Sequence, residues 1–181
     1  MSNEVDFFID GADYYESLAH SIEMAREEVF ICGWWVSPEF HLIRPCEGKN
    51  LDYRLDNLLA RVAKKGVKIY IIVYFESSFL TNDSGYTIEA LQGMHEKNIK
   101  VIRHPQIILP TYWSHHEKLV VIDQELAYMG GLDLCYGRYD TPTHLIDDND
   151  PTYYPGIEYN NCRINDFVDV RNYRKENVTR N

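Results

Sequence analysis

Cysteine is scarce in this chain, with four among 181 residues. No two of them form a Cys-x-x-Cys pair, so neither a zinc ribbon nor a dense disulfide framework is indicated. Scattered single cysteines favour reduced thiols and a cytoplasmic protein. The four positions are Cys32, Cys46, Cys135 and Cys162.

Long apolar runs are also absent. None approaches the roughly 18 residues of a membrane-spanning helix, so any membrane contact is expected to be peripheral. The first residues, MSNEVDFFIDGADYYESLAH, are acidic and have neither the basic start nor the apolar stretch of a secretory signal. We therefore expect a cytoplasmic protein that meets membranes only from their surface.

Positive charge is in deficit. Lysine and arginine number 18 against 28 aspartates and glutamates, which gives a formal net charge of -10. A chain with this balance has no general attraction for a polyanion, so nucleic acid is disfavoured as a partner. What the chain does have is 45% hydrophobic and 13% aromatic residues, the composition of a folded protein of about one domain.

Apolar residues alternate between helical and strand-like spacing along the first 105 residues. Asp13 is a possible N-cap of the first helix, and VFICGWWV is expected to be a strand buried on both faces. Alternating helices and strands predict an α/β domain whose mixed sheet is largely parallel and flanked by helices. Helices are expected at 14–28, 51–66 and 84–98, and strands at 29–36, 67–75 and 99–105.

The spacing of apolar residues changes after residue 110. HEKLVVID (116–123) and LAYMGG (126–131) are strand-like runs only a few residues apart, which predicts a hairpin. Beyond it, residues 141–181 are rich in Asp, Asn, Pro and Tyr and have little periodicity. We expect a catalytic unit over 1–140 and an irregular tail or arm over 141–181. The DDND cluster at 147–150 is taken as a solvated turn, because the spacing of an EF-hand calcium loop is missing.

The hairpin carries the candidate chemistry. In a strand, His116 and Lys118 point to one face and His115 and Glu117 to the other, so His116 is the candidate nucleophile or base. Asp123 ends the apolar run, where a carboxylate could orient an imidazole or a lysine. An isolated His-x-Lys is more often a core histidine beside an edge lysine.

Glycines after the second run strengthen the case. Gly130 and Gly131 end a strand, where they permit close backbone approach and offer amide donors to an anion, and Asp133 follows them. The complete pattern resembles the HKD signature of the phospholipase D superfamily. It reads His116-x-Lys118-x4-Asp123-x6-Gly130-Gly131-x-Asp133.

The resemblance extends over nearly the whole chain. GGLDLCYGRYD is similar to the eukaryotic phosphatidylcholine-hydrolysing branch, and the blocks FFIDGADYYESLAHSIEMAREEVFICGWWVSPEFHLIRP, YRLDNLLARVAKKGVKIYIIVY, IKVIRHP and YYPGIEYNNCRINDF resemble the blocks around its first HKD motif. The chain is thus identified as resembling one half of a phospholipase D-type fold.

The resemblance implies a role for each residue of the motif. In this family a histidine attacks phosphorus and forms a phosphohistidine, which water or a primary alcohol resolves, and that histidine is His116. Lys118 would stabilise charge on the phosphate oxygens without a metal. Asp133 would support the site through hydrogen bonds, together with Gly130 and Gly131 at the substrate. Asp123 is included as a catalytic candidate but ranks below the others, because it ends its strand.

Two tryptophans lie at the C-terminal end of the first predicted strand, at the edge where α/β sheets bind ligands. Alternation allows only one of Trp34 and Trp35 to serve the substrate, and we select Trp35 as the substrate-binding candidate, although both could be core residues. No histidine pair has ligand spacing with a cysteine or carboxylate, so neither a metal nor a cofactor is predicted.

Three functions remain open. The first is one catalytic half of a phospholipase D that acts on phosphatidylcholine at a membrane surface. Eukaryotic members carry two HKD motifs, and the complete motif occurs once in these 181 residues, so a second half from the same gene product or another chain is an expected partner. The second is a single-HKD nuclease or phosphodiesterase that dimerises, and the third is a non-catalytic truncated fragment that binds phosphoinositides or proteins.

Overall fold

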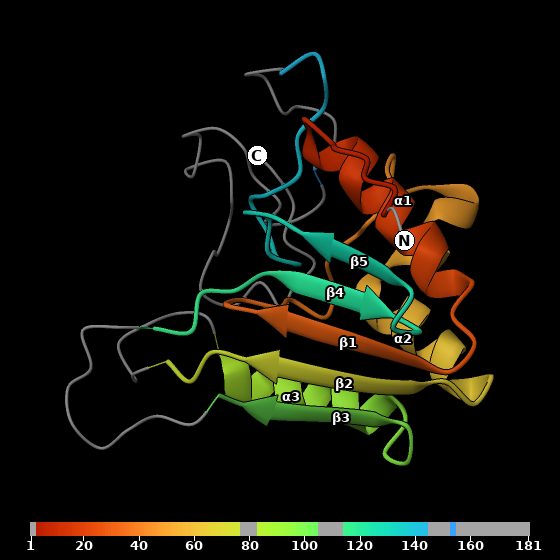
Figure 1. Ribbon diagram of the computed structural model, residues 1–181, viewed down its shortest axis with the longest axis vertical. Helices are drawn as coiled ribbons and strands as arrows, with labels where there is room; N and C mark the ends of the chain where they lie inside the picture. The colour runs from red at the N-terminus through yellow and green to blue at the C-terminus, as the bar shows by residue number, and fades with distance from the viewer. Residues whose placement is uncertain (1–2, 77–82, 105–113, 145–152, 155–181) are drawn as a thin grey trace.

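Five short strands form one mixed sheet in the order β3-β2-β1-β4-β5 (Figure 1). The structure, a computed structural model, describes residues 3–76, 83–104, 114–144 and 153–154. The strands are β1 Glu28–Gly33, β2 Lys68–Val73, β3 Ile99–Arg103, β4 Leu119–Ile122 and β5 Leu126–Met129. The helices are α1 Gly11–Glu23, α2 Leu55–Lys64 and α3 Ser84–Met94, with a 3-10 helix at Gly48–Tyr53.

The two kinds of strand pairing follow the two halves of the chain. β1, β2 and β3 are parallel, joined by helices, whereas β4 runs antiparallel to both β1 and β5. The predicted α/β class with a mixed sheet is confirmed, and so is the hairpin. Because β4 is antiparallel, its first residue pairs with the end of β1, with Leu119 opposite Cys32. The start of β4 therefore lies at the edge of the sheet where the parallel strands end.

The parallel strands β1, β2 and β3 are each buried on one face only. In β1, Val29 and Ile31 are buried, but Phe30 between them is 37% exposed and stacks on the ring of Tyr70 at 5.3 Å. The prediction that β1 is buried on both faces is wrong, because all three helices pack behind the same side of the sheet (Figure 1). An unbroken apolar run in the sequence does not distinguish these two arrangements.

The helices bury the faces that their spacing predicts. In α2 the buried side chains include Leu55, Leu58, Leu59 and Val62. α1 begins at Gly11, three residues before the predicted start, and its N-cap is Asp10, so the prediction that Asp13 caps it is wrong. Asp13 lies in the first turn, where a carboxylate still favours the helix dipole.

Most of the predicted tail, including the DDND cluster, lies outside the described residues. Within the part of the chain that the structure describes, no helix is long and apolar enough to cross a membrane.

Candidate active site

His116 and Lys118 lie just before β4, whereas Asp123 follows β4 and Asp133 follows β5. The predicted strand over 116–123 is shorter in the structure, because residues 114–118 are irregular and β4 begins at Leu119. This segment enters the sheet at the edge where β1 ends. His116 is exposed there, whereas Lys118 is only 7% exposed. One reactive side chain is thus presented to solvent and the other is held inside.

A buried ion pair holds Lys118. Its Nζ lies 3.0 Å from Oδ2 of Asp133, which is 1% exposed. Burying two charges is costly unless they are paired and hydrogen-bonded. The second carboxylate oxygen of Asp133 accepts hydrogen bonds from the backbone N–H groups of Trp34, at 2.8 Å, and Trp35, at 3.2 Å. The carboxylate of Asp133 therefore forms an ion pair with Lys118 through one oxygen and accepts backbone hydrogen bonds from the residues after β1 through the other.

A further contact fixes Asp133 in place. The hydroxyl of Tyr15, in α1, donates a 2.7 Å hydrogen bond to the backbone carbonyl of Asp133. Gly33, at the end of β1, is packed closely against Val36, since a Cβ at Gly33 would lie only 2.8 Å from a methyl group of Val36. Asp133 thus joins α1, the end of β1 and Lys118, which is the supporting position that the motif predicts for it.

The glycine pair lies beside Lys118 but is not crowded. The N–H of Gly130 donates a 3.4 Å hydrogen bond to the carbonyl of Lys118. Gly130 and Gly131 are exposed, and a Cβ added to either would meet nothing within 4 Å. Packing within the described residues therefore does not require glycine at these positions.

The aromatic ring beside His116 belongs to Trp34. The two ring centroids are 5.5 Å apart, and Trp34 also stacks on Tyr74 at 6.2 Å. Trp35, the tryptophan selected from the sequence, contributes its backbone N–H to Asp133. Strand alternation could not decide between the two, because both follow Gly33, the last residue of β1.

Asp123 is not brought together with the other motif residues. It follows β4, at the opposite end of that strand from His116 and Lys118, and has a φ of 51°. Its carboxylate accepts backbone hydrogen bonds from Arg26, Glu27 and Glu28 at 2.8–2.9 Å. Burial opposes the charge, but these hydrogen bonds and the charge of Arg26 hold the pKa of Asp123 below its usual value. This geometry favours a structural role, closing the loop before β1.

One other His-x-Lys pair exists, at His95 and Lys97. It has no aspartate after four more residues, and it lies between α3 and the start of β3. The parallel strands begin at that edge, so this pair is at the other side of the sheet from His116.

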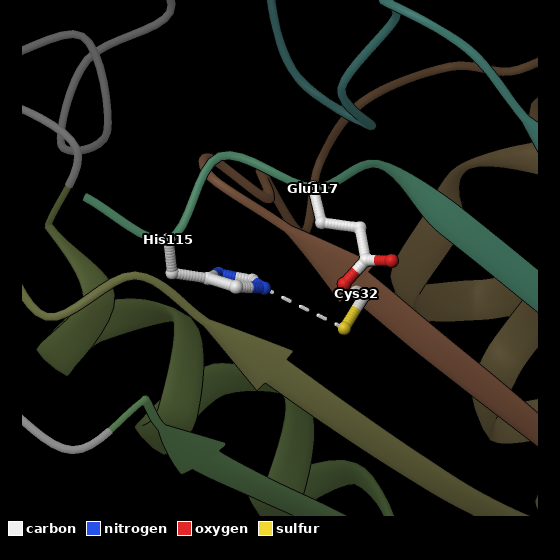
Figure 2. A group of neighbouring side chains, drawn as sticks. All are labelled: Cys32, His115 and Glu117. Atoms are coloured by element: carbon white, nitrogen blue, oxygen red, sulfur yellow. Dashed lines mark hydrogen bonds between the residues drawn. The ribbon is translucent and has the colours of Figure 1, made fainter. Parts of the chain in front are cut away.

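His115 points away from the ion pair. Its Nε2 lies 3.6 Å from Sγ of Cys32 (Figure 2), and its ring stacks on that of His104 at 4.9 Å. Burial, with a contribution from His104, lowers the pKa of His115. His115 and Glu117 gather on one side of the segment with Cys32, as alternation predicts. Cys32 and Tyr15 were not predicted as site residues, because contacts across 83 and 118 residues leave no local pattern in the sequence.

The arrangement suits chemistry on an anionic phosphate. The ammonium of Lys118 has three N–H donors. One faces Asp133, and one reaches the carbonyl of His116 at 3.2 Å. The third has no partner among the described residues and could bind a phosphate oxygen beside the imidazole of His116. A fixed positive charge of this kind stabilises developing negative charge without reorganisation.

Comparisons with known proteins agree on one family. Residues 21–166 match the family profile described as Phospholipase D. Phospholipase D zeta 1 of Arabidopsis thaliana is 45% identical over 164 residues, which are 89% of this chain and 15% of the relative. Phospholipase D1 of Saccharomyces cerevisiae is 43% identical over 171 residues, 91% of this chain and 10% of the relative. Phospholipase D A of Dictyostelium discoideum is 46% identical over 169 residues, 92% of this chain and 13% of the relative.

Solved structures were compared as well. NucT from Helicobacter pylori covers 70% of each chain with a TM-score of 0.48 and 18% identity. Nuc from Salmonella typhimurium, a phospholipase D family member, covers 68% of this chain and 66% of its own, with a TM-score of 0.46 and 11% identity. The chain spans between 10% and 16% of the length of the curated relatives it matches.

Proposed function

The chain belongs to the phospholipase D family, and on this premise we propose that it is one catalytic half of a phospholipase D that hydrolyses phosphatidylcholine to phosphatidic acid and choline. The observation that carries the proposal is the buried Lys118–Asp133 pair beside an exposed His116. Replacing a buried ion pair by apolar side chains of similar size often leaves stability unchanged or raises it. A buried lysine–aspartate pair at this position therefore points to a role of the lysine charge in the reaction and not in stability.

The proposed reaction has two steps. In the first, the imidazole of His116 attacks phosphorus, a P–N bond forms, and the bond from phosphorus to the choline oxygen breaks. The departing oxygen takes a proton from an acid in the second half. In the second step the group that protonated choline takes a proton from water, the water oxygen attacks phosphorus, the P–N bond breaks, and phosphatidic acid is released. Lys118 stabilises the charge on the non-bridging oxygens in both steps.

The second half supplies the acid that protonates the leaving group. The complete motif occurs once in the 181 residues, and one histidine cannot readily be both the nucleophile and the acid that protonates the leaving group. We propose that the partner is a second HKD half, from the rest of the same protein or from another chain. The substrate lies in a bilayer, so we propose a protein that works in the cytoplasm at a membrane surface.

Choline release from phosphatidylcholine vesicles in the presence of a metal chelator tests this function. The chain should be active with a second HKD half from one of its relatives, and His116→Ala should reduce choline release to background. His115→Ala is the matched control, because this neighbour points away from Lys118 and should leave most of the activity. Equal loss in the two variants would contradict the assignment of His116.

Lys118→Arg tests the shape of the phosphate site. The guanidinium is planar and larger than the ammonium, so it should not restore the activity lost in Lys118→Ala. Nearly full activity of Lys118→Arg in the same assembly would argue against a tightly shaped pocket.

The 181-residue chain alone should show little turnover. Loss of general acid help typically costs about 10²–10⁴ in rate, and the second lysine is lost with the second histidine. Robust choline release from a discrete dimer of this chain, measured together with its size, would instead support the alternative of a single-HKD enzyme that completes its site by dimerisation. A nuclease of that kind is disfavoured by the net charge of -10.

A further inference from the structure

Three potential metal ligands meet beside the candidate active site. Cys32 is in β1, and His115 and Glu117 come from the segment before β4 (Figure 2). The Sγ of Cys32, one ring nitrogen of His115 and one carboxylate oxygen of Glu117 all lie within 4.8 Å of one another. Cys32 and His115 are half-buried, and Glu117 is exposed. Residue spacing along the chain predicted no metal site, but the pairing of β4 with β1 brings Cys32 to the two other residues.

The spacing of the atoms matches the coordination of zinc. Zinc binds thiolate sulfur at about 2.3 Å and imidazole nitrogen at about 2.1 Å with tetrahedral angles, which places the two ligand atoms about 3.6 Å apart. The distance between Sγ of Cys32 and Nε2 of His115 is 3.6 Å. An ion could therefore enter between these two side chains with little rearrangement.

We propose that Cys32, His115 and Glu117 form a site for a zinc-class divalent ion, with one coordination position left open. A thiolate, an imidazole and a carboxylate are ligands that zinc accepts, and the soft thiolate disfavours magnesium and calcium. Cys32 also lines an apolar groove of about 310 Å³ on the uncovered face of the sheet. The open position is available to water or to a small anion.

The protonation states of the ligands set how the ion binds. Burial and the charge of Glu117 raise the pKa of the Cys32 thiol, so the metal-free side chain is protonated at neutral pH. Binding exchanges that proton for the metal: the S–H bond breaks, the S–metal bond forms, and one proton goes to solvent. His115 needs no such step, because burial lowers its pKa and keeps the ring neutral.

Metal binding through Nε2 selects one tautomer of His115. Its Nδ1 is buried and has no hydrogen-bond partner within the described residues, whereas Nε2 faces Cys32. A proton on Nδ1 leaves the lone pair of Nε2 free for a metal. The bound ion would tie residues 115–117 to the end of β1, directly beside His116.

Metal binding to the full chain provides the test. The protein is first stripped with a chelator, and its zinc affinity is then measured by competition with a chromophoric chelator. Cobalt(II) is added in a second titration, because a thiolate ligand gives a near-ultraviolet charge-transfer band and a tetrahedral site gives intense visible bands. We expect one ion per chain, a thiolate band, and release of one proton per ion.

Matched variants decide whether these residues hold the ion. Cys32→Ser should abolish the thiolate band, and His115→Ala and Glu117→Gln should each weaken zinc binding by at least about 100-fold, more than the loss of an outer-shell partner. The controls Cys46→Ser, His95→Ala and Glu96→Gln change the same residue types elsewhere and should bind zinc normally.

Other results would overturn the proposal. These are the absence of a stoichiometric ion, a thiolate band that survives Cys32→Ser, or equal weakening in the control variants. Glu117 is exposed, so Glu117→Gln leaves the fold intact, and its unchanged zinc affinity would remove Glu117 from the site. None of these measurements depends on catalytic activity, so failure of the proposed function leaves them interpretable.

Discussion

Breaking the Lys118–Asp133 pair should destabilise the fold more when one partner is removed than when both are neutralised. Lys118→Met leaves the carboxylate of Asp133 buried without a counter-charge, and Asp133→Asn leaves the ammonium buried in the same way. The asparagine keeps an oxygen that can accept the N–H group of Trp34. In the double variant neither charge is present, so no uncompensated charge stays inside.

The magnitude follows from burial. The two side chains are 7% and 1% exposed, and removing one partner from a buried pair costs about 3–5 kcal/mol. Domains of this kind are stable by only about 5–15 kcal/mol, so each single variant loses a large part of its stability. The double variant should lose less than either single variant, because replacing a buried ion pair by neutral groups is often close to neutral in stability, whereas breaking it leaves an unpaired charge.

Urea unfolding followed by tryptophan fluorescence measures these differences. A loss of about 4 kcal/mol with a slope of about 2 kcal/mol per molar urea lowers the midpoint by about 2 M. Lys97→Met is the control, because Lys97 is exposed and its loss should change stability by less than about 0.5 kcal/mol. Single variants that lose under about 1 kcal/mol, or a double variant that loses as much as either single variant, would refute the reasoning.

Three further predictions concern stability. Burial and the nearby charges of Arg44 and Arg54 lower the pKa of His41 from 6.5 to about 4, so the unfolded chain binds the extra proton first. Stability should therefore fall between pH 6.5 and pH 4, and His41→Gln should flatten this part of a urea midpoint profile. The lowered pKa of Asp123 gives stability that is present above its unfolded pKa and lost as the pH falls through the folded value. Asp123→Asn should remove that acid-dependent loss without changing choline release, and a large loss of activity in a folded variant would contradict a structural role. Tyr15→Phe should cost about 1–3 kcal/mol in thermal or urea unfolding, because it leaves the buried carbonyl of Asp133 without its donor; an unchanged midpoint would argue against that bond.

Local patterns predicted the elements of this fold well. Apolar spacing located three helices and five strands, because each buries one continuous stripe or face against the others. It did not reveal that β1 is covered on one side only, since the side chains of Phe30 and Tyr70 are apolar although they face outward. The ends of α1 were also shifted, as helix boundaries depend on backbone geometry around Asp10 that composition does not fix.

The candidate site was only partly predictable. Spacing identified His116, Lys118 and Asp133, and the last two form the buried pair. The tryptophan beside His116 and the cysteine beside His115 come from β1 and the residues after it, and depend on how β4 pairs with β1. Which distant strands pair is decided by tertiary packing, and the apolar spacing within each strand does not show it.

The residue that carries the covalent intermediate can be identified by mass spectrometry. The chain, assembled with a second HKD half, is mixed with a short-chain phosphatidylcholine, quenched within one turnover under alkaline conditions, digested and sequenced by mass spectrometry. We predict an acid-labile phosphatidyl group on His116, or its deacylated remnant, absent from the His116→Ala protein and unaffected by His115→Ala. A modified His115, or an active assembly with no modified histidine in this chain, would contradict it.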